Sequence, residues 1–302
     1  MIEDAVAQQA SHNILIYEEL KNVLSAFRRC GIKVIILKGA ALLESVYSHI
    51  GQRKMGDVDL LVKEKDLLKA ENELMKQGYR LLYKSKWLYL KYYGAIQFAM
   101  HLYHKIPYLK DKSIIWQKAL ALKIVGEDAL IMSPEENIIY LSYHLAVQHG
   151  EPHGKWIEDI DTLLRHYKGD IDWQKLIKKI KSYKLDIPCY YTLRKVKDDF
   201  NTPVPDSVLA EIKPANSLKA KVFKLVFQEK KPIPSISYFL EVLIQPRLLF
   251  SSSFPSLKFL QIRYKVNPPL AYLYYIIRPI TLFLEGIKAV GRLLWRVVNT
   301  TG

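Results

Sequence analysis

The sequence predicts an α+β protein in which a mixed β-sheet with helices is followed by a mainly helical C-terminal part. In the first 115 residues, short apolar runs rich in β-branched residues alternate with stretches of helical periodicity. After about residue 115, the periodicity is mostly helical. We therefore expect an α/β domain at 1–115, a helical domain at 116–235 and a basic, apolar-rich helical segment at 236–302.

The predicted elements of the first domain follow one another at short intervals. Apolar residues at helical spacing predict three helices, at 3–29, 40–50 and 65–77. Runs of β-branched and apolar residues predict four strands, at 33–39, 58–62, 79–83 and 92–104. Glycines end several of these elements, as Gly31, Gly39 and Gly78 do.

The second part of the chain opens with a strong helix-start signal at Ser133. A serine cap is followed by a proline in the first turn and by Glu135 and Glu136, whose charges suit the positive end of the helix dipole. Later helical patterns occupy 157–167, 172–183 and 216–229.

Composition sets limits on the class of protein. Half of the 302 residues are apolar and a quarter are charged, which is typical of a folded chain. Cys30 and Cys189 are too far apart to suggest a disulfide framework or a zinc site. The N-terminus lacks the features of a signal peptide, and Arg278 and Pro279 interrupt the longest apolar stretch. We expect a cytoplasmic protein.

The chain carries a net charge of +15, which favours anionic partners such as nucleotides, nucleic acid or an anionic membrane surface. The charge alone does not choose among these partners, and a basic, solvated surface would explain it as well.

Asp57 and Asp59 are the residues that first suggest chemistry. Side chains at i and i+2 on a strand point to the same face of the sheet. Two neighbouring carboxylates repel each other unless a cation lies between them. Mg²⁺ takes a few carboxylates together with waters and phosphate oxygens, so the pair is suited to holding Mg²⁺ (or Mn²⁺) on a triphosphate.

The residues around this pair suit the binding of phosphates. Gly39 stands at a strand-to-helix turn, where glycine lets a phosphate approach the backbone and the helix N-terminus offers N–H groups. Lys38 and Arg53 supply positive charge. With Gly56, which precedes Asp57, they form the predicted nucleotide-binding set.

The string LKGAALLESVY…GQRKMGDVDLLV…GY resembles the uncharacterised nucleotidyltransferase family of the DNA polymerase β superfamily. The resemblance is tightest over 31–80, where a Lys-Gly pair, an arginine and a D-x-D strand follow in order. It implies a nucleotidyltransferase fold, an NTP substrate and Asp57 and Asp59 as metal ligands. Weaker matches follow later in the chain, at Tyr143-His144, His149, Lys155-Trp156, Asp159 and Arg278-Pro279.

The resemblance also implies a third carboxylate on a neighbouring strand, two residues before a histidine. The best match, FAMHL at 98–102, has Ala99 in that position, and alanine cannot bind a metal. Gln97 and His101 share the strand face of Ala99. Three explanations stay open. Another carboxylate, such as Glu151 or Glu158, fills the role; the enzyme uses one metal with His101 as the base; or the protein binds nucleotide without turning it over.

His144, His149 and Asp159 could suggest a metal site. Histidines at i and i+5 do not share a face of an α-helix well, since metal-binding pairs usually stand at i and i+4. We therefore favour a structural role for both histidines, hydrogen-bonded to the backbone or to Asp159.

The last part of the chain is basic and aromatic. From Glu241 onward there are two acidic and eight basic residues, and 280–298 predicts a basic amphipathic helix with Trp295 beside its basic face. The simpler interpretation is that its apolar face packs on the helical domain. The alternative is peripheral contact with an anionic membrane.

The leading functional hypothesis is transfer of a nucleoside monophosphate from an NTP to an unidentified acceptor, a small molecule, peptide or protein, with release of pyrophosphate. The alternative is a catalytically impaired nucleotide-binding regulatory or partner protein, which Ala99 favours. A third hypothesis, nucleotide addition to an RNA end, has less support because the sequence contains no known RNA-recognition module.

Overall fold

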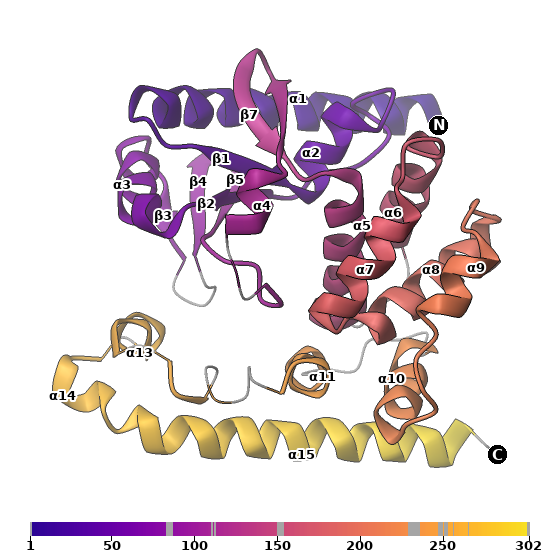
Figure 1. Ribbon diagram of the computed structural model, residues 1–302. Helices are drawn as coiled ribbons and strands as arrows, with labels where there is room; N and C mark the ends of the chain where they lie inside the picture. Colours follow the sequence, from indigo (N-terminus) through magenta and orange to yellow (C-terminus); the bar gives the residue numbers. More distant parts are fainter. Residues whose placement is uncertain are drawn as a thin grey trace. The chain divides into compact units, whose positions relative to one another are not determined.

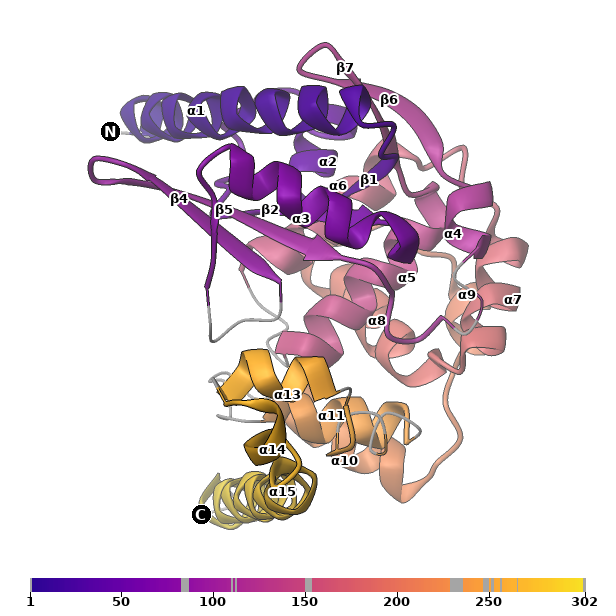
Figure 2. The same ribbon diagram turned by 90° about the vertical axis from the view of Figure 1, so that its left-hand side faces the viewer.

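The computed structural model describes residues 2–82, 87–109, 111, 113–149, 154–228, 236–246, 250, 253–255, 257–264 and 266–300. The chain divides into two compact units, Met1–Asn137 and Ile138–Gly302. Figures 1 and 2 show the elements of each unit, and the two units are described separately.

Within its described residues, the first unit contains a mixed sheet of seven strands in the order β3-β4-β5-β2-β1-β7-β6. The strands are β1 (Val34–Leu37), β2 (Val58–Val62), β3 (Arg80–Leu81), β4 (Leu88–Tyr93), β5 (Ile96–Tyr103), β6 (Leu120–Ile124) and β7 (Glu127–Ile131). In the centre, β2 runs antiparallel to β1 and parallel to β5, while β7 pairs parallel with the other edge of β1. The predicted mixed sheet is therefore confirmed.

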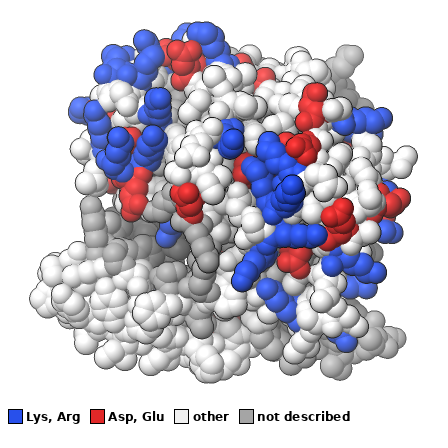
Figure 3. All heavy atoms as spheres, viewed as in Figure 1, with Lys and Arg blue, Asp and Glu red and all other residues white. Residues whose placement is uncertain are grey.

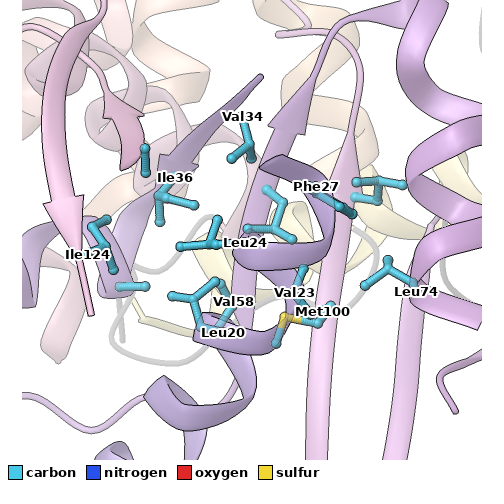
Figure 4. Packing of buried hydrophobic residues seen from close by; sticks show 14 of the residues in the cluster. Leu20, Val23, Leu24, Phe27, Val34, Ile36, Val58, Leu74, Met100 and Ile124 are labelled. Atoms are coloured by element: carbon cyan, nitrogen blue, oxygen red, sulfur yellow. The ribbon is translucent and has the colours of Figure 1, made fainter. Parts of the chain in front are cut away.

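One face of this sheet packs against helices. The helices of the first unit are α1 (Ile2–Arg29), α2 (Lys38–Ser45), α3 (Leu67–Lys76) and α4 (Ser113–Gln117), with a short 3₁₀ turn at Glu64–Asp66. The apolar faces of α1 and α3 meet alternate residues of the central strands. Figure 4 shows Leu20, Leu24 and Phe27 of α1 beside Ile36 and Val58. Each fully buried side chain of this kind contributes roughly 1.5–3 kcal/mol.

This packing fixes the direction of every other strand residue. Because Val58, Leu60 and Val62 of β2 point into the helix-covered core, Asp59 must point to the opposite face. In β5 the core residues are Phe98, Met100 and Leu102, so Ala99 and His101 share that opposite face with Asp59. The hydrophobic pattern thus places all three side chains together on one side of the sheet.

The predicted strand at 92–104 is two strands in the structure. β4 ends at Tyr93, and the chain reverses at Gly94, whose φ of +55° is in the left-handed region that glycine adopts easily. β5 then pairs antiparallel with β4, Leu90 opposite Ala99. Aromatic and apolar residues continue through the turn, which conceals it in the sequence.

The sheet extends beyond residue 115, where the sequence suggests that the α/β domain ends. β6 and β7 form a hairpin whose turn residues, Val125 and Gly126, have φ values of +47° and +82°. Its second strand joins β1 with Ile131 opposite Ile36. This pairing is remote along the chain, so no local pattern indicates it.

The second unit is helical throughout its described residues, as expected. Its helices are α6 (Lys155–His166), α7 (Trp173–Tyr183), α8 (Asp186–Phe200), α9 (Asp206–Glu211), α10 (Leu218–Gln228), α11 (Ile236–Ile244), α13 (Leu257–Tyr264), α14 (Pro268–Ala271) and α15 (Tyr274–Thr300). α5 (Pro134–Tyr143) runs across the boundary between the units and leads into a π-helical turn at His144–His149.

α15 differs from the sequence-based expectation. The helix continues through both Arg278 and Pro279. The segment Pro268–Lys288 has a mean hydropathy of 1.3 and is long and apolar enough, by length and composition alone, to cross a membrane. Arg278 and Pro279 thus interrupt the run of apolar residues in the sequence, but they do not end the helix.

Candidate active site

Lys38 stands where β1 passes into α2. Leu37 is extended, with φ −116° and ψ 161°, and Lys38 then adopts a φ of +52°. A left-handed conformation costs a non-glycine residue roughly 1–2 kcal/mol. The helix begins at Lys38 itself, two residues before the start at 40 that the sequence predicts.

The ammonium of Lys38 forms an ion pair with Asp59. Nζ lies 3.0 Å from Oδ1, and the two side chains are only 11% and 4% exposed. Leu37 is directly opposite Asp59 in the β1–β2 register, so the residue after Leu37 starts beside the carboxylate. Burial lowers the pKa of Lys38, but the neighbouring Asp59, Tyr103 and Asp57 together raise that pKa above its ordinary value. The ammonium of Lys38 is therefore held in its charged form.

Asp57 lies at the open end of the same strand. It directly precedes β2, and its side chain is 44% exposed. Oδ2 of Asp57 is 3.3 Å from Nε2 of His101 on β5. His101 is also opposite Asp59 in the β2–β5 register, so its imidazole lies near both aspartates. The structure thus brings together four predicted residues: Lys38, Asp57, Asp59 and His101.

Ala99 occupies the position across from Asp57. In the parallel β2–β5 register Val58 is opposite Met100. The preceding residues, Asp57 and Ala99, therefore stand at the same level. Ala99 is buried and offers only a methyl group there. The alternative carboxylate Glu158 belongs to α6 of the second unit, and Glu151 lies outside the described residues.

Gly39 contacts the guanidinium of Arg53. A Cβ on Gly39 would clash with Nη1 of Arg53 and come within 2.8 Å of its Cζ. Arg53 is itself buried, so its side chain has little room to move away. This gives Gly39 a steric role in addition to the predicted approach of a phosphate. At Gly56, by contrast, an added Cβ would meet no atom within 4 Å.

The loop that carries Arg53 is fixed by α1, through a residue that the sequence-based reasoning missed. Asn13 is fully buried, and its Nδ2 donates to the carbonyl oxygens of Ile50 and Arg53 at 2.6 and 2.7 Å. Its Oδ1 accepts from the backbone N–H of Met55 at 3.1 Å. The available signal was an asparagine on the apolar face of α1, at helical spacing from Ile16.

His144 and His149 are closer than an α-helix would allow. The turn that contains them is π-helical, so residues at i and i+5 come together, and the two ring centroids are 4.4 Å apart. Nδ1 of His144 and Oε1 of Gln148 are 2.7 Å apart, and His149 stacks on Trp156 at 3.9 Å. The argument that this pair does not share a helix face well is therefore wrong, because it assumes α-helical geometry.

The side chains on this face of the sheet can be compared with the ligands that a magnesium ion takes. Two carboxylates two residues apart, of which Asp57 is 44% exposed, fit one Mg²⁺, which takes a few carboxylates together with waters and phosphate oxygens. The methyl group of Ala99 leaves a second metal without its usual third carboxylate. Among the described residues, no group of three or more His, Cys, Asp or Glu side chains is arranged to hold a metal ion.

Comparison with known proteins gives one extended match. The model of a family described as "Uncharacterised nucleotidyltransferase" matches residues 1–201, which include the whole first unit. No curated protein matches the chain. Among solved structures, the antibiotic-resistance factor ANT(2'')-Ia is 16% identical, with a TM-score of 0.42 over 56% of this chain and 93% of that one. An antigenic nucleotidyltransferase-like protein from Paracoccidioides brasiliensis is 14% identical, with a TM-score of 0.40 over 57% and 89%.

Proposed function

Because the chain belongs to the uncharacterised nucleotidyltransferase family, we propose that it transfers a nucleoside monophosphate from an NTP to an acceptor, using the face of the sheet that carries Asp57 and Asp59. Asp57 and Asp59 would hold one Mg²⁺. When bound, that ion would neutralise charge on the triphosphate and orient it. The acceptor carries a nucleophilic oxygen, and its chemical class is left open.

The observation that carries this proposal is the charge arrangement around Asp59. The buried carboxylate of Asp59 lies near the start of the buried strand β2, with the ammonium of Lys38 at 3.0 Å. Burying such a pair gains little stability compared with apolar residues of the same size, so its presence suggests a use. Lys38 and Arg53 together supply positive charge for the phosphates, which suits a reaction that depends on positioning and electrostatics.

In the proposed reaction, the acceptor oxygen forms a bond to the α-phosphorus. The bond from that phosphorus to the oxygen bridging to the β-phosphate breaks, and pyrophosphate leaves. The acceptor proton goes to His101, whose Nε2 is 3.3 Å from Asp57 and therefore close to the open carboxylate.

Ala99 favours a second candidate function, nucleotide binding without turnover. It stands level with Asp57, in the position where a third carboxylate would help to deprotonate the acceptor and hold a second metal. The loss of such a group costs several kcal/mol of transition-state stabilisation in comparable sites. The two candidate functions use the same binding site and differ only in whether the nucleoside monophosphate is transferred to an acceptor.

The test is incubation of the purified protein with Mg²⁺ and each α-labelled NTP, with and without host extract. We expect label to move to an acceptor with the wild type and to fall at least about a hundredfold in Asp57→Asn and Asp59→Asn. Leu218→Glu, a surface change in the second unit, serves as the control and should be fully active. His101→Gln separates a proton acceptor from a mere neighbour of Asp57, because only the first role would alter the pH profile of the rate.

Two results would reverse the conclusion. If only Ala99→Asp moves label, the natural protein binds nucleotide and lacks turnover. If neither protein moves label and NTP binding is the same in Asp57→Asn and Asp59→Asn, the site does not hold the metal–triphosphate complex at all.

A further inference from the structure

The longest helix of the second unit leaves a row of large apolar side chains exposed to solvent. Those on α15 are Ile276, Ile277, Ile280, Phe283, Leu284, Ile287 and Trp295, and Phe283 is 68% exposed. At 3.6 residues per turn these positions fall within an arc of about 120° on the helix. Monomeric proteins rarely expose a contiguous apolar surface as long as the part of the strip from Ile276 to Ile287, so the strip points to a partner.

The other side of α15 is attached to its own unit. Arg278 is buried, and its Nη1 donates to the hydroxyl of Tyr264 on α13 at 2.9 Å. Tyr275 donates to the carbonyl of Pro255 at 2.9 Å. α15 also contacts α11 and α14. Figures 1 and 2 both show α11 and α13 on the same side of α15, and within the described part of the unit Ile276, Ile280 and Phe283 of this helix are exposed.

The exposed strip has a basic border. Lys288 and Arg292 follow the strip at one edge of the helix, about 120° and 160° from Ile276. Lys288 also pairs with Glu285 at 3.0 Å. From Glu241 to the end the sequence has eight basic and two acidic residues. Figure 3 shows mainly uncharged side chains over α14 and the start of α15, in contrast to the charged surfaces elsewhere.

The charge distinguishes between the partners that such a strip could take. A second copy of the chain would bring an equally basic segment against this one, and like charges oppose that contact. An anionic lipid surface offers hydrocarbon for the strip and negative headgroups for its border. Aromatic residues at both ends of the strip, Tyr272 and Trp295, suit the boundary between headgroups and hydrocarbon.

The packing also favours a helix lying on the membrane over one crossing it. A crossing helix is apolar all round, whereas α15 is apolar on its exposed side and holds Arg278 on the packed side. Crossing would also break the Arg278–Tyr264 and Tyr275–Pro255 contacts or draw α13 into the bilayer. A helix in the plane of the surface keeps these contacts intact.

We propose that α15 docks this protein onto an anionic membrane surface, with the strip from Ile276 to Trp295 in the interface and Lys288 and Arg292 toward the headgroups. The nucleotidyl transfer proposed above would then take place beside a membrane. Docking does not require that reaction, so it can be tested in the wild type as well as in Asp57→Asn or Asp59→Asn.

The experiment is flotation of the full-length protein, purified without detergent, with vesicles of phosphatidylcholine alone or of equimolar phosphatidylcholine and phosphatidylglycerol. We expect at least tenfold more protein on the anionic vesicles, and a decrease with added salt. Phe283→Glu should reduce this binding at least tenfold, and Arg292→Glu should weaken it and flatten the salt dependence. Leu218→Glu, the same kind of change at a 78% exposed site on α10, should bind like the wild type.

Three results would overturn the proposal. The first is equal flotation of wild type and Phe283→Glu, or no flotation of either while both are folded by circular dichroism. The second is a dimer in light scattering that Phe283→Glu converts to a monomer, because a second copy would then cover the strip. The third is a membrane fraction from cells that keeps the protein after alkaline carbonate washing, which would mean that the helix crosses the bilayer.

Discussion

The sheet face of the first unit and helix α15 of the second depart from ordinary burial in opposite directions. The sheet buries charge, at Asp59, Lys38 and Arg53, where apolar side chains would be expected. α15 exposes apolar side chains where charge would be expected. Buried polar groups and exposed apolar strips are the informative exceptions in a folded protein. In this chain one exception indicates a charged ligand and the other an apolar surface.

The two regions also differ in what holds them in shape. Lys38 is the counterion of Asp59, and Asn13 fixes the loop that carries Arg53. The sheet face is therefore organised before any ligand arrives. The strip on α15 is largely in solvent, with Ile276 66% and Phe283 68% exposed. We therefore expect substitutions at the sheet face to cost stability and substitutions on the strip to cost almost none.

The largest expected effect is that of Lys38→Met, which leaves Asp59 buried without its counterion. We expect the free energy of unfolding to fall by about 3–5 kcal/mol, measured by chemical denaturation at neutral pH. In the double variant with Asp59→Asn the loss should be smaller, since neither charge is then left alone. An equal loss in both variants would mean that the unpaired Asp59 carboxylate is not the cause of the destabilisation.

The same pair makes a prediction about pH. Because the folded-state pKa of Lys38 is raised above its ordinary value of 10.5, the contribution of the pair is fully present below 10.5 and is lost as the pH rises through the raised value. The stability difference between wild type and Lys38→Met should therefore be constant around neutral pH and shrink only in the strongly alkaline range. A difference that disappears near neutrality would contradict the assignment.

Next in size is Asn13→Ala, which removes three hydrogen bonds from the loop that carries Arg53. We expect a loss of about 2 kcal/mol in the free energy of unfolding, together with weaker NTP binding because the guanidinium is no longer held. Ser11→Ala, an exposed change on the same helix, is the control and should remain within about 0.5 kcal/mol. Unchanged NTP binding would separate the loop from the nucleotide site.

A smaller effect is expected for Gly39→Ala, whose methyl group must displace the end of the Arg53 side chain. We expect about 1 kcal/mol of destabilisation, measured by the same denaturation, and almost none when the change is made in an Arg53→Ala background. Gly169→Ala, where an added Cβ meets no atom within 4 Å, is the matched control. The same loss in both backgrounds would place the strain in the backbone.

The smallest effect is expected on the exposed strip. Phe283→Ser should change the free energy of unfolding by no more than about 0.5 kcal/mol, because the ring is already in water. Leu20→Ala in the core should cost about 2–5 kcal/mol. A cost above about 2 kcal/mol for Phe283→Ser would mean that another part of the protein covers this face and would weaken the case for membrane docking.

The sequence was most informative where the pattern is local. β2 forms over the predicted residues 58–62, and the fold class and family membership are confirmed. The aspartates, Lys38 and His101 come together because one-residue alternation decides which face of a strand each occupies. A shift of one residue in the pairing of these strands would have put their side chains on opposite faces of the sheet.

The features that escaped prediction depend on remote contacts or unusual backbone geometry. The pairing of β1 with β7 joins segments that have no common pattern, and the Gly94 turn is concealed by apolar neighbours. The π-helical turn requires an extra residue per turn, which periodicity arguments based on α-helices exclude. Asn13 acts on a loop some forty residues away, and only its apolar surroundings mark it.

The parallel pairing of β1 with β7 has a consequence for synthesis of the chain. Ile36 must wait for Ile131, which is 95 residues later (131 − 36), before this edge of the sheet can close. During translation β1 can pair early with β2, but its second edge stays open until the hairpin of β6 and β7 has left the ribosome. An open strand edge invites pairing with other chains, so nascent chains stalled before residue 131 should be the form most dependent on chaperones.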